Sequence, residues 1–114
     1  MRRHLVVFLT IALAACGKQD EAEKLQKSAD SWRATLLFVA DAGLRNEVRS
    51  GFARKTAEAA VEELSGGAAK SGLPRSITVR VERLIGIAAK LQTAIESGDR
   101  VGIANARREL ADAR

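Results

Sequence analysis

The chain after residue 20 carries apolar residues at helical spacing. They recur at intervals of four and three residues, at Leu25, Ala29, Trp32, Leu36 and Val39. This spacing places them on one face of a helix, which we predict over residues 20–43. Asp20 and Glu23 have the spacing of a capping box at its start, and Gly43 is a suitable stop.

A second helix is predicted over residues 52–65. Its apolar face is formed by Phe52, Ala53, Ala57, Ala60, Val61 and Leu64. Gly66-Gly67 is expected to end this helix, and the stretch from there to Pro74 reads as a loop. The break between the first two helices falls within residues 44–51. This stretch contains Asn46 and is bounded by Gly43 and Gly51. The pattern does not fix its position more closely.

Two further helices are predicted in the C-terminal half. Pro74 suits the first turn of the third helix, and Gly98 is expected to end it. Spacings of four and three continue for about five turns through Ile77, Val81, Leu84, Ala88, Leu91 and Ile95. Ile77, Val79 and Val81 also alternate with polar residues, as in a strand, but a strand as long as the whole pattern would be unusual.

The fourth helix is expected to begin after Asp99, whose side chain can cap it. Its apolar face holds Ile103, Ala106, Leu110 and Ala113. The chain is therefore predicted to be all-α. Residues 20–114 are expected to form a small antiparallel bundle of three or four helices joined by short links.

Residues 1–15 differ from the rest. Met1 to His4 form a short basic region, and Leu5 to Ala15 are apolar apart from Thr10. An apolar helix of that length spans about 16 Å, roughly half the hydrocarbon thickness of a bilayer. It is too short for a stable membrane span and has the layout of a cleavable signal peptide that precedes a bundle domain.

The sequence Leu13-Ala14-Ala15-Cys16 closes this segment. It resembles the lipobox of bacterial lipoproteins, and the resemblance covers only about the first 17 residues. It implies cleavage between Ala15 and Cys16 and acylation of the Cys16 thiol. Residues 16–19 would then be a lipidated tether, and two or three acyl chains hold a protein firmly on a membrane.

The residues around the lipobox indicate a destination. In the lipoprotein pattern of Gram-negative bacteria, Asp after the cysteine favours the inner membrane. Here Gly17 and Lys18 follow, so the resemblance implies the outer membrane, facing the periplasm. Two alternatives are an ordinary secretory signal with a chance cysteine and a twin-arginine signal at Arg2-Arg3. The position of Cys16, which is the only cysteine, favours the lipobox.

The part after residue 15 offers little catalytic chemistry. The only histidine, His4, lies in the leader, and tyrosine is absent. Without histidine or a free thiol, we expect no His-based acid–base catalysis, no cysteine nucleophile and no His- or Cys-ligated metal site. Glu58, Glu62 and Glu63 are interpreted as a solvated helix face. We therefore predict a non-enzymatic protein without a cofactor.

The run Leu36-Leu37-Phe38-Val39-Ala40 is apolar all around the helix, because successive residues turn by about 100°. Either this helix is central in the bundle, or the side that carries Leu37 and Phe38 is an interface with a partner or a second copy. Trp32, the only tryptophan, lies on the apolar stripe and is expected to be a core residue.

Basic residues suggest a second kind of surface. The net charge of +5 falls to +3 without Arg2 and Arg3, which is too small an excess to indicate a nucleic-acid-binding protein. Arg45, Arg49, Arg80 and Arg83 are nevertheless candidates for contact with anionic lipid headgroups or an acidic partner.

The sequence thus predicts a membrane-anchored envelope lipoprotein with a helical protein-interaction module. The first alternative is a structural or anionic-lipid-contacting module that uses a basic helical face. A small enzyme is the second alternative, and the sequence nominates no residues for it.

Overall fold

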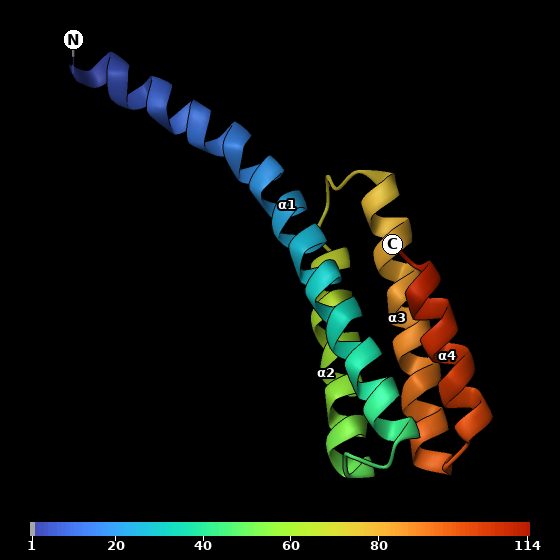
Figure 1. The fold of residues 1–114 in the computed structure, drawn as a ribbon. Helices are drawn as coiled ribbons and strands as arrows, with labels where there is room; N and C mark the ends of the chain where they lie inside the picture. The colour runs from blue at the N-terminus through green and yellow to red at the C-terminus, as the bar shows by residue number, and fades with distance from the viewer. Residues whose placement is uncertain (1) are drawn as a thin grey trace.

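A computed structural model describes the backbone of residues 2–114 and the side chains of residues 20–114. Four helices follow in chain order: α1 (Arg2–Leu44), α2 (Ser50–Ala68), α3 (Arg75–Ser97) and α4 (Arg100–Asp112), and residues 2–114 contain no strand. Successive helices run in opposite directions, and the first part of α1 extends beyond the other three (Figure 1). The predicted all-α antiparallel bundle is confirmed, with four helices.

Helix α1 lies against all three other helices, while α3 is packed between α2 and α4 (Figure 1). The core is made of aliphatic side chains, and no polar or charged residue among residues 20–114 is buried in it. The largest fully buried side chains are Leu36, Val39, Leu64, Val81, Leu84, Leu91 and Leu110. Burial of this apolar surface is the main contribution that holds the four helices together.

The predicted start of the first helix at residue 20 is wrong. Helix α1 is continuous from Arg2 to Leu44, so Asp20 and Glu23 lie within the helix and form no capping box. Between these bounds the sequence contains no proline and, before Gly43, only one glycine, Gly17, so nothing in it interrupts the helix. The side chains of the lipobox, including Cys16, lie outside the described side chains.

The turn between α1 and α2 is set by Asn46. Its backbone φ of 59° is left-handed, a conformation that asparagine tolerates better than most residues. The amide of Glu47 then donates to the Ala42 carbonyl at 2.9 Å, and that of Asn46 donates to the Gly43 carbonyl at 3.2 Å. This is the Schellman arrangement that ends a helix and satisfies its last carbonyls.

Helix α2 runs past the glycine pair that we expected to end it. Gly66 and Gly67 lie inside the helix, which continues to Ala68. Gly67 faces Leu25 of α1 so closely that a Cβ atom at Gly67 would lie 2.5 Å from the Leu25 Cδ1 atom. The missing side chain therefore lets α1 approach α2, and the chain leaves the helix only after this contact.

Helices α3 and α4 form as the pattern predicted. Pro74 lies one residue before α3 rather than in its first turn. Gly98 ends α3 in a left-handed conformation, with φ of 66°, and the Asp99 amide donates to the Ala94 carbonyl at 2.9 Å. The Asp99 carboxylate then accepts from the Gly102 amide at 3.0 Å and caps α4. One dipeptide thus both ends a helix and starts the next.

Candidate interaction surface

The bundle has two ends, which carry different side chains. The turns at residues 45–49 and at Gly98-Asp99 lie at the same end, where residues from both line one hollow. We call this end the distal end. The other end holds the loop of residues 69–74 and the C-terminus, on the side from which α1 extends (Figure 1). Among residues 20–114, three of the four large exposed apolar side chains, those of Phe38, Phe52 and Val101, lie on the distal half.

Helix periodicity places Phe38 and Phe52 at the distal end of one groove between α1 and α2. Thr35 of α1 and Thr56 of α2 both line a hollow between the two helices. Phe38 is the next residue along that side of α1 toward the distal end, and Phe52 is the next along α2. The Phe38 side chain is 66% exposed and that of Phe52 is 60% exposed. We call these two residues the Phe38–Phe52 patch.

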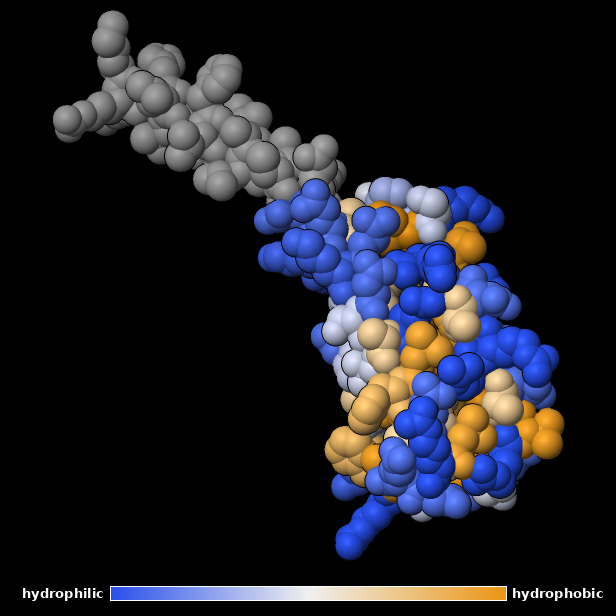
Figure 2. All heavy atoms as spheres, in the orientation of Figure 1, coloured by the Kyte–Doolittle hydropathy of each residue, from blue (hydrophilic) through white to orange (hydrophobic). Residues whose placement is uncertain are grey.

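Apolar side chains gather on the surface in this region. Figure 2 shows them at the lower left of the bundle, over the distal ends of α1 and α2, among charged side chains. Phe52 was predicted to be on the buried face of α2. It precedes the buried Ala53 by one position, which turns it about 100° away from the stripe of Ala53, Ala57, Ala60 and Leu64. A strict helical wheel would have placed Phe52 outside the core.

The apolar run of α1 is only partly covered. Leu36, Val39 and Ala40 are buried, and Leu37 is half-buried against the core. Phe38 remains exposed although α1 contacts every other helix. Helix α1 thus packs against all three other helices, and its Phe38 side is left uncovered by residues 20–114. The interpretation of that side as an interface stays a prediction.

Trp32 lies at the other part of the same groove. It is half-buried and packs against the core, so it sits at the core edge rather than in its centre. Its indole Nε1 donates to the Glu63 carboxylate at 2.8 Å. This hydrogen bond joins α1 to α2 and uses one of the three α2 glutamates. All three glutamates are exposed.

The four candidate arginines do not form one surface. Arg45 and Arg49 are exposed in the distal turn, and Arg83 is exposed on α3. Arg80 of α3 is four-fifths buried and pairs with Asp30 of α1, with 2.6 Å between the Arg80 Nη2 and Asp30 Oδ1 atoms. Asp30 precedes Leu44 by 14 residues of helix, or about 21 Å. The structure thus separates Arg45 and Arg49 from Arg80.

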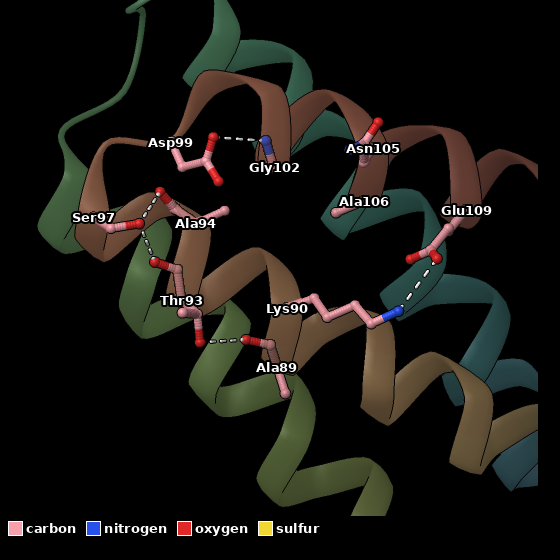
Figure 3. A pocket seen from close by; sticks show the side chains of 10 residues that line it. All are labelled: Ala89, Lys90, Thr93, Ala94, Ser97, Asp99, Gly102, Asn105, Ala106 and Glu109. Carbon is pink, nitrogen blue, oxygen red and sulfur yellow. Dashed lines mark hydrogen bonds and ion pairs between the residues drawn. The ribbon is translucent and has the colours of Figure 1, made fainter.

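A second hollow lies between α3 and α4, and its polar side chains other than Asn105 are already engaged. Lys90 faces Glu109 across it, with 3.3 Å between their charged atoms (Figure 3). The Thr93 and Ser97 hydroxyls donate to carbonyls of their own helix, and Asp99 caps α4 (Figure 3). The residues left to line the hollow are Asn105 and small residues such as Ala89, and they offer no acid–base pair.

Within the described part of the chain, no three His, Cys, Asp or Glu side chains stand close enough to bind a metal ion. No helix of the same residues has the length and apolar character needed to span a bilayer. Comparison with protein-family models, with curated proteins and with solved structures finds no match to this chain.

Proposed function

We propose that this chain is a lipid-anchored, non-enzymatic envelope protein that binds a protein partner through the Phe38–Phe52 patch. The lipobox resemblance at Leu13-Ala14-Ala15-Cys16 supports the anchor. Gly17 and Lys18 after the cysteine favour the outer membrane, with the bundle in the periplasm. The exposed patch supports the binding role.

The observation that carries the binding role is the exposure of two aromatic rings beside one groove. A large aromatic side chain gains free energy when it leaves water, and aromatic residues are enriched in protein interfaces. Single exposed apolar residues are common on any surface. Phe38 and Phe52 come from different helices and continue the two rows of residues that line one groove, an arrangement that suits an interface anchor.

The charges near the patch are of both signs, which suits a protein partner better than a uniformly anionic membrane: Lys27 lines the same groove as Glu63, and Lys55 lies one turn from Phe52. Glu58 and Glu62 are exposed on α2 beyond the patch, and Glu63 lines the groove itself. These carboxylates would be repelled by anionic headgroups if this face lay on a lipid surface. For the lipid-contacting alternative, Arg45 and Arg49 at the distal tip are the two candidate arginines that lie together, and Arg83 is exposed on α3.

Photo-crosslinking in the native envelope tests the binding role. A photoreactive residue at Phe38 or Phe52 of the full chain is expected to capture a protein of defined mass, identified by mass spectrometry. The control places the same photoreactive residue at position 79. Val79 is exposed on α3 and lies away from the patch. Equal capture at Val79, or none at Phe38 and Phe52, would contradict the proposal.

Fractionation tests the anchor separately. The wild-type chain is expected in the membrane fraction, with a mass increase from acyl chains on Cys16. The Cys16→Ala variant is expected in the soluble fraction. An intact Met1 or an unmodified Cys16 thiol in the native protein would overturn the lipoprotein assignment.

A further inference from the structure

We propose that the partner of this surface is a second copy of the chain, packed with its α2 antiparallel to the first α2. This inference rests on the proposed binding role of the Phe38–Phe52 patch and names its occupant. Three features of α2 carry it: the order of its charges, the spacing of its exposed residues and the space beside Gly66.

The charges of α2 are segregated along the helix. Arg54 and Lys55 lie in its first half, whereas Glu58, Glu62 and Glu63 follow. This order opposes the helix dipole, which favours acidic residues near the N-terminus and basic residues near the C-terminus. None of the three glutamates forms an ion pair with a basic residue of α2 in the described part of the chain. Arg54 instead pairs with Glu96 of α3, and Glu63 accepts from the Trp32 indole of α1. The charges of α2 that have no such contact within the described residues are Lys55, Glu58 and Glu62.

An antiparallel copy makes the same order favourable. Lys55 of each α2 then faces Glu62 of the other, whereas a parallel copy would set Lys55 against Lys55 and Glu62 against Glu62. Lys55 and Glu62 are both exposed and lie on the outward side of the helix. Across a two-fold axis, Lys55 of each copy would pair with Glu62 of the other copy, which gives two equivalent ion pairs.

The exposed residues have the spacing of a helix–helix seam. Phe52, Lys55, Ala59, Glu62 and Gly66 follow one another at intervals of three and four, and all five are exposed. Ala59 is the centre of this series. When Ala59 faces Ala59 of an antiparallel copy, Phe52 faces Gly66 and Lys55 falls beside Glu62 and Glu63.

Gly66 provides the space that this register requires. A Cβ atom at Gly66 would have no other atom within 4 Å, so the helix surface there is open. Phe52, with Phe38 beside it, would fill this space on the other copy, and the small Ala59 residues would let the two helices approach closely. A large side chain thus meets the smallest one at both ends of the seam.

The arrangement is compatible with anchoring in one membrane. A symmetric pair on one membrane needs its two-fold axis along the membrane normal. Two antiparallel bundles meet this condition when their long axes lie in the membrane plane. Helix α2 is about 28 Å long, so the contact is small and the pair weak in solution. Shared anchoring raises the effective concentration of the two copies.

Disulfide trapping tests the register. In the full lipidated chain, Ala59→Cys is expected to form a disulfide-linked dimer under mild oxidation, because residue 59 lies on the two-fold axis. The control is Ala89→Cys, which replaces an equally small exposed residue on α3. Equal trapping at residue 89, or none at residue 59, would overturn the proposal. A disulfide-linked dimer of the wild type would instead reveal a free Cys16 thiol, and would count against the anchor rather than the register.

Charge exchange tests the pairing. Lys55→Glu and Glu62→Lys are each expected to weaken self-association about tenfold, because each places like charges together twice. The double variant is expected to restore it, and high salt to weaken the wild-type dimer. If the double variant is as weak as the single ones, the proposed pairing is wrong. If the wild type is monomeric while Phe38 still captures another protein, the second-copy inference fails and the binding role stands.

Discussion

Leu25 of α1 packs directly over Gly67 of α2, and a Cβ atom on Gly67 would lie 2.5 Å from the Leu25 Cδ1 atom. The neighbouring Gly66 has open space at the same position. Two adjacent glycines in one helix therefore differ in what a methyl group would meet, and this difference can be measured.

We predict that Gly66→Ala stabilises the fold by about 0.5–1 kcal/mol, because alanine favours the helix. Gly67→Ala has the same helical preference but forces Leu25 to move. We expect it to be less stable than Gly66→Ala by about 1 kcal/mol or more. Urea denaturation of both variants measures the difference. Leu25→Ala should remove most of it in a double-mutant cycle, and equal stabilities of the two glycine variants would show that the contact is unimportant.

Arg33 joins α1 to the end of α4. Its Nε atom donates to the Leu110 carbonyl at 2.8 Å, and its Nη2 atom donates to the Ala111 carbonyl at 2.9 Å. These carbonyls belong to the last turn of α4 and have few partners within the helix. Arg33 therefore acts as a C-terminal cap supplied by another helix.

Arg33→Ala is expected to lower the free energy of unfolding by about 1–2 kcal/mol. Arg33→Lys should restore little, because one ammonium group cannot donate in the same forked geometry. Hydrogen exchange should accelerate in the last turn of α4 before the rest of the bundle. Arg83→Ala, at an exposed arginine of α3, is the matched control and should change stability by less than about 0.5 kcal/mol. A loss as large in that control would argue against the capping role.

The positions that sequence analysis placed correctly are those in long uninterrupted patterns. Every predicted apolar position of the third and fourth helices, from Ile77 to Ala113, is buried. Five turns of consistent spacing leave only one face for the core. Gly98 and Asp99 were also predicted correctly because turn and cap chemistry is local, and it needs no knowledge of the other helices.

The misplacement of Phe52 was local, because the helical wheel already puts it off the core face, but other errors concern contacts between helices. Nothing near Gly67 in the sequence reveals that Leu25 lies against it. A glycine pair usually favours the end of a helix, so Gly66-Gly67 was interpreted as the end of the second helix. The exposure of Phe38 depends on how far α2 and α4 cover α1, which no local pattern records. Trp32 was expected in the core, but its indole hydrogen bond to Glu63 holds it at the core edge.

Asp99 provides a local test of the turn between α3 and α4. Asp99→Ala removes the acceptor for the Gly102 amide and is expected to cost about 1 kcal/mol, whereas Asp99→Asn should lose less because asparagine is also a good cap. Thermal unfolding followed by circular dichroism measures both. Asp112→Ala, at an exposed aspartate at the opposite end of α4, serves as the control. Equal effects at Asp99 and Asp112 would contradict a specific capping role.

The most direct test of the surface is a charge placed on it. Phe38→Asp is expected to leave the helical content and the unfolding transition nearly unchanged, because the side chain is already exposed. It should abolish crosslinking at Phe52 or weaken self-association about tenfold, because docking would bury an unpaired carboxylate. Leu36→Asp, two residues away, places the same charge in the core and should unfold the bundle. If Phe38→Asp also unfolds, its ring serves the fold rather than a partner; if it folds and still associates normally, the patch is not the interface.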